Sequence, residues 1–259
     1  MPFVDLPGVH LWYEDSGGSG AAVVLMHSAS GSADSWVHQV PDFTTAGYRC
    51  VTYDRLGSGR SRSDPSTAPR PYVSDDLDNL VQYLGLDRFH LVATAAGAAG
   101  ALDYALSYPE RVRSLVLADG TAGVQDAGYL ELLKRIRPPE IDALPVELRE
   151  LSASYRGADP EGTQRWIEIE RASRQEGPRL SRQGSRNQVT FSLLETLSVA
   201  TLILAGDADM RTPPSQMRLL AAKIPGAQFA TVPEAGHAAH WEQPEIWNRT
   251  VLEFIASHQ

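Results

Sequence analysis

The sequence predicts an α/β fold in which helices flank a mostly parallel central sheet and one helical segment is inserted. Three observations support this prediction. Short continuous apolar runs, for example at residues 21–26 and 201–205, are typical of strands buried on both faces of a parallel sheet. Amphipathic segments such as residues 74–84 alternate with these runs. Between residues 121 and 198, however, charged amphipathic pieces replace the apolar runs.

Composition narrows the class of protein further. The 259 residues fit one α/β domain with an insertion, and 42% hydrophobic and 21% charged residues are ordinary for a soluble globular enzyme. Residues 1–5 lack the features of a signal peptide, and no apolar run approaches the roughly 20 residues that span a bilayer, so we expect a cytoplasmic protein. The net charge of −9 disfavours nucleic acid and anionic membranes as partners. The single Cys50 excludes an intrachain disulfide and is expected to be a core thiol.

The first elements of the chain follow from local patterns. Residues 9–14 alternate in polarity and precede a glycine-rich turn, which predicts a strand. A crossover helix is expected over residues 34–46, with Trp36 facing either the core or a pocket. The helix at 74–84 has Ser74 as its expected N-cap, followed by acidic residues that the helix dipole favours.

The central stretch, residues 89–106, predicts a strand, a sharp turn and a helix. It begins with apolar residues and continues as an alanine-rich segment of high helix propensity. A tight turn of this kind brings backbone segments close together and requires small residues, which Ala93, Ala96 and Gly97 provide. Ala95 stands at the apex of the turn.

The last part of the chain returns to the strand pattern. A strand at 201–205 leads into a loop that contains Asp209, and a final strand at 229–232 leads into a loop that contains His237. A closing helix is expected over residues 245–257.

Four loops carry motifs that recur together in one enzyme family. The loop that starts at His27 is similar to an HG-x-x loop, and residues 93–97 stand where G-x-S-x-G is usual. Residues 206–209 fit G-x-x-D, and residues 236–244 fit GH-x-x-x-x-E-x-P. The order of elbow, acid and histidine is that of the α/β-hydrolase fold family, which the chain resembles over nearly its whole length.

The resemblance implies a division of the chain into two parts. In this family an insertion between strands forms a helical lid that gates the substrate site. We therefore expect an α/β-hydrolase core made of residues 1–120 and 199–259, and a helical lid made of residues 121–198.

The resemblance also implies a Ser-His-Asp type of site. His237 would act as the base, while Asp209 would hold its imidazole and stabilise the imidazolium. The backbone N–H groups of Ala29 and Ala96 would bind the oxyanion. Asp119, which also follows an apolar strand, is a second candidate for the acid.

Members of such a family act on small molecules. The resemblance implies a hydrolase for an ester, a lactone or a β-diketone-like C–C bond of a partly apolar substrate, which Ser28, Trp166 and Trp241 would contact. No cofactor is expected, because the sequence has no phosphate-binding glycine loop. No metal is expected either, because His237 and His240 have no third ligand nearby in sequence.

Ala95 carries a methyl group where the family has a serine hydroxyl, and three interpretations stay open. In the first, alanine is an introduced replacement that inactivates a serine hydrolase. In the second, it is native, and His237 with Asp209 activates water or serves as base in a proton transfer, an elimination or a cofactor-free oxygenation. In the third, the chain is a non-catalytic protein that binds a small ligand.

Neither Thr94 nor Ser28 is expected to replace the missing nucleophile. The side chain of Thr94, one residue before the apex, should point away from the position of Ala95. Ser28 lies in the predicted oxyanion loop, where it could hydrogen-bond a substrate carbonyl. His27 is expected to order that loop by hydrogen bonding rather than to take part in catalysis.

Overall fold

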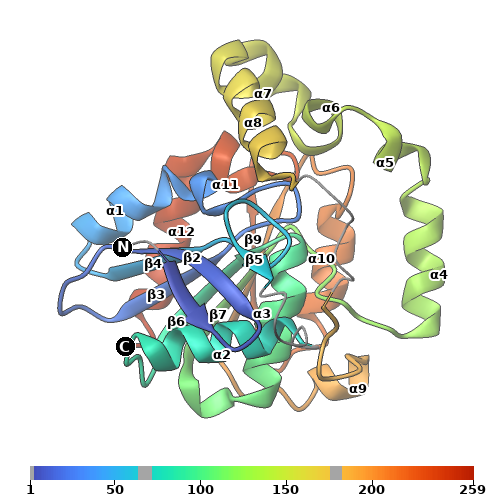
Figure 1. Ribbon diagram of the computed structural model, residues 1–259. Coiled ribbons are helices and arrows are strands. Elements are labelled where there is room, and N and C mark those ends of the chain that lie inside the picture. The colour runs from blue at the N-terminus through green and yellow to red at the C-terminus, as the bar shows by residue number, and fades with distance from the viewer. Residues whose placement is uncertain (1–2, 64–71, 176–182) are drawn as a thin grey trace.

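The computed structural model describes residues 3–63, 72–175 and 183–259. Within these residues, nine strands form one sheet in the order β1-β2-β4-β3-β6-β7-β8-β9, with β5 paired to β2 (Figure 1). The strands are β1 (Phe3–Leu6), β2 (Val9–Asp15), β3 (Ala22–Met26), β4 (Arg49–Tyr53), β5 (Arg62–Ser63), β6 (Phe89–Thr94), β7 (Val112–Ala118), β8 (Thr201–Gly206) and β9 (Gln228–Val232). Strand β2 pairs antiparallel with β1, β4 and β5, whereas the pairs from β4 to β9 are parallel. The predicted α/β fold class is confirmed.

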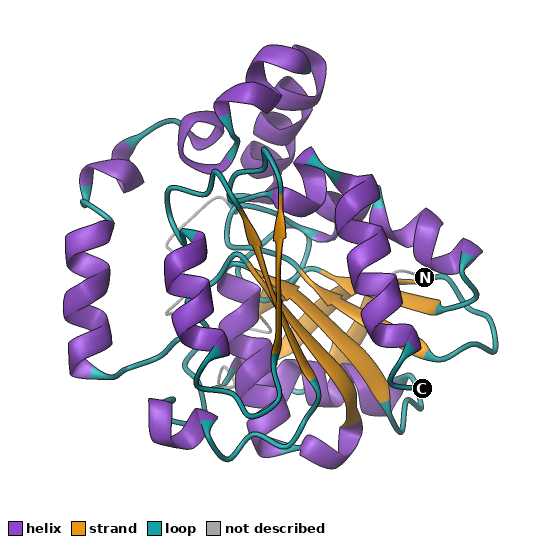
Figure 2. Cartoon of the chain, turned by 180° about the vertical axis from the view of Figure 1, so that it is seen from behind, coloured by secondary structure: helices purple, strands orange, loops and turns teal. Residues whose placement is uncertain are grey.

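Helices cover both faces of this sheet (Figure 2). The 3₁₀ helices span Ala33–Trp36 and Pro109–Arg111, and the α-helices are α1 (Gln39–Thr45), α2 (Val73–Tyr83), α3 (Ala96–Ser107), α4 (Ala127–Ile136), α5 (Glu140–Ala143), α6 (Val146–Glu150), α7 (Ala153–Ala158), α8 (Pro160–Ser173), α9 (Phe191–Leu194), α10 (Pro214–Ala221), α11 (Ala239–Glu242) and α12 (Pro244–Ala256). Helices α2, α3 and α10 supply core residues on one face, and α1 and α12 supply them on the other. None of the helices in the described residues is long and apolar enough to cross a membrane.

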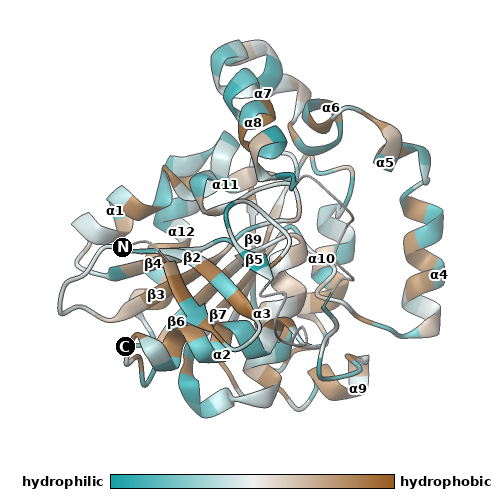
Figure 3. Ribbon diagram, in the orientation of Figure 1, coloured by the Kyte–Doolittle hydropathy of each residue, from teal (hydrophilic) through white to brown (hydrophobic). Residues whose placement is uncertain are grey.

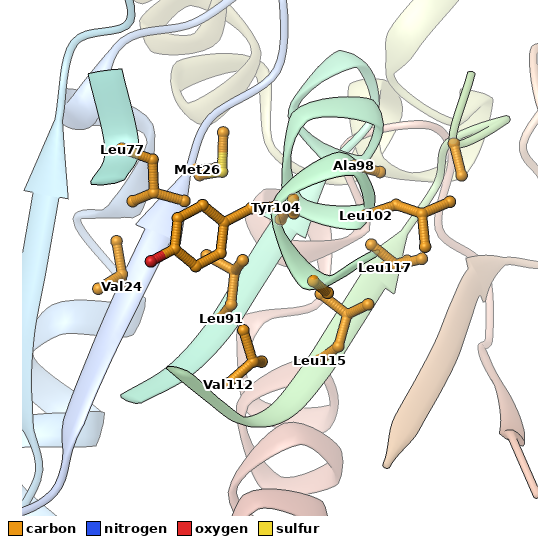
Figure 4. Close-up of a cluster of buried hydrophobic side chains, with 14 of the residues drawn as sticks. Val24, Met26, Leu77, Leu91, Ala98, Leu102, Tyr104, Val112, Leu115 and Leu117 are labelled. Atoms are coloured by element: carbon orange, nitrogen blue, oxygen red, sulfur yellow. The ribbon is translucent and has the colours of Figure 1, made fainter. Parts of the chain in front are cut away.

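The apolar runs of the sequence form strands that contribute to two cores. Side chains alternate along a strand, so Val24 and Leu91 join the cluster beneath α2 and α3, while Val23 and Val92 join the cluster beneath α1 and α12. Figure 4 shows Tyr104 of α3 lying against Val24 and Leu91. Because both faces of the central strands are buried, neither face of these strands is polar, as the sequence pattern indicated.

The predicted first crossover helix is divided. A 3₁₀ helix ends at Trp36, and α1 begins at Gln39. Pro41 explains the new start, because a residue without an N–H is tolerated in the first turn of a helix and not further along it. Trp36 lies in the core and not in a pocket: it is fully buried, with its ring 4.9 Å from that of His240 and 6.0 Å from that of Trp247.

The predicted N-cap at Ser74 is wrong. Helix α2 already begins at Val73, and Tyr72 occupies the cap position without a side-chain hydrogen bond. The hydroxyl of Ser74 instead donates to Asp103 at 2.7 Å. Asp103 is fully buried on α3, and a buried carboxylate requires hydrogen-bond donors, so a tertiary contact takes the place of the local cap.

Helices α4–α9 lie between β7 and β8, in the predicted insertion. Figure 1 shows α6, α7 and α8 above one edge of the sheet and α4 at its side, and in Figure 3 α7 is mostly hydrophilic while α8 carries both hydrophobic and hydrophilic residues. The end of the insertion is different, because Val189, Leu194 and Leu197 belong to the cluster beneath α2 and α3, which we call the main core. We call α4–α8, residues 127–173, the cap; its role as a lid stays a prediction.

The close approach of α3 to β3 gives the first testable prediction. A Cβ atom at Gly97 would lie 2.6 Å from the carbonyl oxygen of Met26 and 2.8 Å from that of His27. Gly97→Ala should therefore lower the free energy of unfolding by about 1–3 kcal/mol in urea denaturation. Gly128→Ala in α4 is the matched control, because a Cβ there meets nothing within 4 Å. It should be neutral or stabilising by up to about 1 kcal/mol, and equal losses in the two variants would contradict the argument.

Candidate active site

The turn between β6 and α3 is a strained elbow. Ala95 at its apex has φ 49° and ψ −116°, a conformation that costs a non-glycine residue of order 1–3 kcal/mol. Its N–H donates to the carbonyl of Ala118 at 2.8 Å, and its carbonyl accepts from the N–H of Ala98 at 3.1 Å. A Cβ at Gly120 would lie 2.4 Å from the carbonyl oxygen of Ala95, so only glycine permits this approach. Ala95 is half-buried and Ala96 is exposed, so the apex is accessible.

The loops after β8 and β9 bring an acid and a histidine together. Nδ1 of His237 lies 2.8 Å from Oδ2 of Asp209, which is the predicted hydrogen bond. Asp209 is 3% exposed and also accepts from the hydroxyl of Thr212 at 2.6 Å and from the backbone N–H of Arg211 at 2.7 Å. Burial works against ionisation of Asp209, but His237 and the Thr212 hydrogen bonds outweigh it and lower the pKa of this carboxyl. Nδ1 is thus the donor to the carboxylate, which leaves Nε2 as the basic nitrogen of His237.

Sheet topology places the elbow on the same edge as this pair. Strands β6, β7, β8 and β9 are consecutive neighbours and parallel, so the loops at their carboxyl ends leave the same edge of the sheet. These loops contain Ala95, Asp119, Asp209 and His237. The carboxyl edge of a parallel sheet is where open α/β folds bind their ligands.

Asp119, the second candidate for the acid, has a different role. It is fully buried, and its Oδ1 accepts from the N–H of Gly206 at 2.8 Å, whereas Oδ2 has no hydrogen-bond partner among the described residues. Burial, reinforced by the negative charge of Asp209, raises the pKa of Asp119 well above its ordinary value. The partner of His237 is therefore Asp209, and the raised pKa of Asp119 disfavours a second negative charge beside this pair.

His27 orders the loop of residues 27–32, which we call the oxyanion loop. Its Nδ1 donates to the carbonyl of Ser28 at 2.6 Å, and its Nε2 accepts from the N–H of Arg55 at 2.9 Å. Burial lowers the pKa of His27 to about 3, so the ring is neutral, as this pattern of one donor and one acceptor requires. Both ring nitrogens are engaged, which supports the predicted ordering role of His27.

The predicted oxyanion donors are available. Ala29 and Ala96 are exposed, and within the described ranges neither backbone N–H has a hydrogen-bond acceptor. Ser28 is buried, and its hydroxyl has no hydrogen-bond partner in the described part of the chain. The hydroxyl of Thr94 is likewise buried and unpaired there. The N–H groups of Ala29 and Ala96 and the hydroxyl of Ser28 thus have no partner in the described structure that would compete with a ligand oxygen.

The two tryptophans predicted to contact substrate pack against each other. Trp166 is 1% exposed and Trp241 is 2% exposed, and their ring centroids are 5.4 Å apart. Together with Val146, Leu151 and Ile169 they form a third apolar cluster that joins the cap to α11. This placement gives both residues a packing role, and contact with substrate stays a prediction.

Three further residues support the site and were not identified from the sequence. Thr212 holds Asp209, as described above. Glu242 accepts from the N–H of Gly236 at 2.9 Å and from the N–H of Ser152 in the cap at 2.8 Å. The motif of residues 236–244 contains Glu242 and could have indicated it, whereas nothing in the local sequence marks Glu150, the third residue, whose contacts are analysed below.

Comparisons with known proteins agree with this fold. The family model described as alpha/beta hydrolase fold matches residues 21–244. A 2-hydroxy-6-oxononadienedioate/2-hydroxy-6-oxononatrienedioate hydrolase of Comamonas testosteroni is 29% identical over 96% of this chain and 91% of its own length. A 2-hydroxy-6-oxo-6-phenylhexa-2,4-dienoate hydrolase of Burkholderia cepacia is 28% identical, again over 96% of this chain and 91% of its own. The solved structure of a thermophilic esterase from Thermogutta terrifontis superposes with a TM-score of 0.80 at 27% identity, covering 100% of this chain and 98% of the esterase.

Asp119 gives a prediction for the pH dependence of stability. Its folded-state pKa is raised above the ordinary value, so the folded protein holds this proton more tightly than the unfolded chain does. The free energy of unfolding should therefore fall as the pH rises from about 4 through the folded-state pKa, by about 1.4 kcal/mol per pH unit within that window. Asp119→Asn removes this titration, so its stability relative to the wild type should increase with pH.

Urea denaturation of both proteins between pH 4 and pH 8 measures this difference. Any constant offset from the new amide group cancels, because the prediction concerns the slope with pH. Asp87→Asn, which makes the same change at an exposed position, is the control. A pH-independent difference between Asp119→Asn and the wild type would contradict a raised pKa at Asp119.

Proposed function

Because the chain belongs to the α/β-hydrolase fold family, we propose that it hydrolyses a small, partly apolar ester, lactone or β-diketone-like C–C bond at the site of Ala95, Asp209 and His237. The observation that carries this proposal is the hydrogen bond of 2.8 Å between His237 and the buried Asp209, at the sheet edge from which the elbow also leaves. It supplies a general base, and the free N–H groups of Ala29 and Ala96 supply the oxyanion donors.

In the chain as it stands, water is the nucleophile. Ala95 offers only a methyl group, so the oxygen of a water molecule bonds to the substrate carbonyl carbon while its proton passes to Nε2 of His237. Asp209 stabilises the resulting imidazolium, and the N–H groups bind the negative oxygen. The intermediate then collapses, the bond to the leaving group breaks, and the leaving group takes the proton from His237.

The relatives support the substrate class. The names of the two bacterial hydrolases describe 2-hydroxy-6-oxo-dienoates, which are vinylogous diketo acids, and the superposing structure is that of an esterase. The unpaired hydroxyl of Ser28, next to the oxyanion donor Ala29, suits a second hydrogen bond to a substrate oxygen. Both classes of compound present a carbonyl carbon to a nucleophile, so one site geometry serves them.

A second interpretation is that Ala95 replaces a serine and leaves the enzyme nearly inactive. The observation in its favour is the strained backbone at Ala95, with φ 49°, together with the close approach of Gly97 and Gly120. Such an elbow exposes a nucleophilic side chain to the substrate, and the methyl group of an alanine cannot act as a nucleophile. In this case the oxyanion donors and the base are in place, and the nucleophilic hydroxyl is missing.

Two variants distinguish water from a missing serine. If water is the nucleophile, His237→Ala should lower kcat/KM by about 10²–10⁴-fold, and Ala95→Ser should change it by less than about tenfold. If serine is missing, Ala95→Ser should raise turnover by several orders of magnitude and become labelled by a fluorophosphonate. Steady-state kinetics with one substrate on all three proteins measure this.

Ala99→Ser is the matched control, because it adds the same hydroxyl four residues later, inside α3, at a half-buried position beyond the apex. It should neither gain activity nor react with the fluorophosphonate. A chain that binds a ligand but responds to neither His237→Ala nor Ala95→Ser would instead be a non-catalytic binding protein.

A substrate panel tests the proposed chemistry. The wild type and Ala95→Ser should be assayed with short p-nitrophenyl esters, lactones and vinylogous diketo acids, each followed by its change in absorbance. We expect turnover in at least one class, with the vinylogous diketo acids favoured because two relatives are named for such compounds. Failure of Ala95→Ser with all three classes would end the hydrolase proposal.

A further inference from the structure

Glu150, the last residue of α6, places a buried carboxylate between the cap and the loops of the site. The residue is only 2% exposed. Its Oε1 accepts from the hydroxyl of Ser30 at 2.5 Å and from Nη1 of Arg211 at 3.0 Å, and lies 3.4 Å from Nε of Arg149. A single carboxylate oxygen thus joins three donors, two of which come from outside the cap.

These two donors belong to different parts of the candidate active site. Ser30 directly follows Ala29, the predicted oxyanion donor of the oxyanion loop. Arg211 is held on one side by Glu150, and its own backbone N–H donates to Oδ1 of Asp209 at 2.7 Å. A shift of Glu150 therefore moves partners that are one residue or one hydrogen bond away from the reacting groups.

The backbone of Glu150 provides a third connection. Its carbonyl oxygen accepts from the N–H of Ala238 at 3.1 Å, and Ala238 directly follows His237. The contact is close, because a Cβ at Gly236 would lie 2.8 Å from this same carbonyl oxygen. One cap residue consequently contacts three loops. They are the oxyanion loop, the loop after β8 that contains Asp209, which we call the acid loop, and the loop after β9 that contains His237, which we call the histidine loop.

We propose that Glu150 is a positioning residue that holds the three loops of the site in their relative positions. Their arrangement then depends on whether the cap is packed against them. The inference deepens the proposed function, on which its catalytic part rests. With α6 in place, Glu150 pairs with Arg211 and the hydroxyl of Ser30 has an acceptor. When α6 leaves, Ser30 and Arg211 both lose this partner at once, and the loops lose their common anchor.

Glu170 in α8 is a matched comparison within the same cap. It is also a buried carboxylate, 7% exposed, and pairs with Arg174 at 2.6 Å and Arg149 at 3.8 Å. In the described part of the chain its carboxylate has no contact with the oxyanion, acid or histidine loop. Replacing Glu170 therefore disturbs the cap in a similar way but leaves the site loops in place.

The test compares Glu150→Ala, Glu150→Gln and Glu170→Gln in the full chain. The nuclear magnetic resonance signals of the Ala29 amide and of the Nδ1 proton of His237 report the geometry without any turnover. Both signals should move in Glu150→Ala, move less in Glu150→Gln, whose amide oxygen still accepts from Ser30, and stay in place in Glu170→Gln. Glu150→Gln also keeps the shape of the side chain, so it gives a result even if Glu150→Ala does not fold.

Kinetics provide the second measurement. The kcat of Glu150→Ala should fall by about 10- to 100-fold, with a smaller change in KM, because misplaced groups act on the reaction step. Ser30→Ala should lose activity too, and the double variant should lose less than the product of the two factors. If neither the wild type nor Ala95→Ser hydrolyses any compound of the panel, the proposed function fails, but the resonance comparison still decides the role of Glu150. Unmoved signals in Glu150→Ala, or equal movement in Glu170→Gln, would overturn it.

Discussion

The close approach of α3 to the sheet is the constraint on which the rest of the structure depends. Gly97 lies against the carbonyl groups at the end of β3, and Gly120 lies against the carbonyl of Ala95, so helix and strands meet with no side chain between them. This contact fixes α3 over β6 and β7, where Tyr104 enters the main core. It also holds the amino end of α3, and with it the N–H of Ala96, at the carboxyl edge of the sheet. A larger residue at either glycine would separate the helix from the strands.

The sequence predicted those features that depend on neighbouring residues. Apolar runs predicted the parallel sheet, and motifs at strand ends predicted that Asp209 would meet His237. Ser74 was misassigned because its hydroxyl bonds a residue 29 positions away instead of its own helix, which no local pattern reveals. Glu150 was missed for the same reason, since Ser30 is 120 positions away from it. The pairing of His237 with Asp209 could be predicted from local sequence, while the tertiary contacts that hold their loops could not.

Asp209, Asp119 and Glu242 are buried carboxyl groups near the carboxyl edge of the sheet, and their pKa values do not all shift in the same direction. Asp209 is kept ionised by His237 and by hydrogen bonds. Burial raises the pKa of Asp119, and the charge of Asp209 adds to this effect, so the charged form of that group is disfavoured. Burial also raises the pKa of Glu242, against the hydrogen bonds it accepts from Ser152 and Gly236. The lowered pKa of Asp209 favours its charged form beside His237, whereas the raised pKa values of Asp119 and Glu242 disfavour theirs.

The elbow performs two structural tasks, and the residue type at position 95 affects only one of them. Its strained backbone presents the side chain at the apex, and it also turns the chain so that the N–H of Ala96 lies free at the start of α3. A methyl group at residue 95 removes the first task only. The second depends on backbone geometry that Gly97, Gly120 and the hydrogen bond to Ala118 enforce. The free N–H of Ala96, the proposed oxyanion donor, therefore does not depend on the side chain at residue 95, whichever nucleophile the site uses.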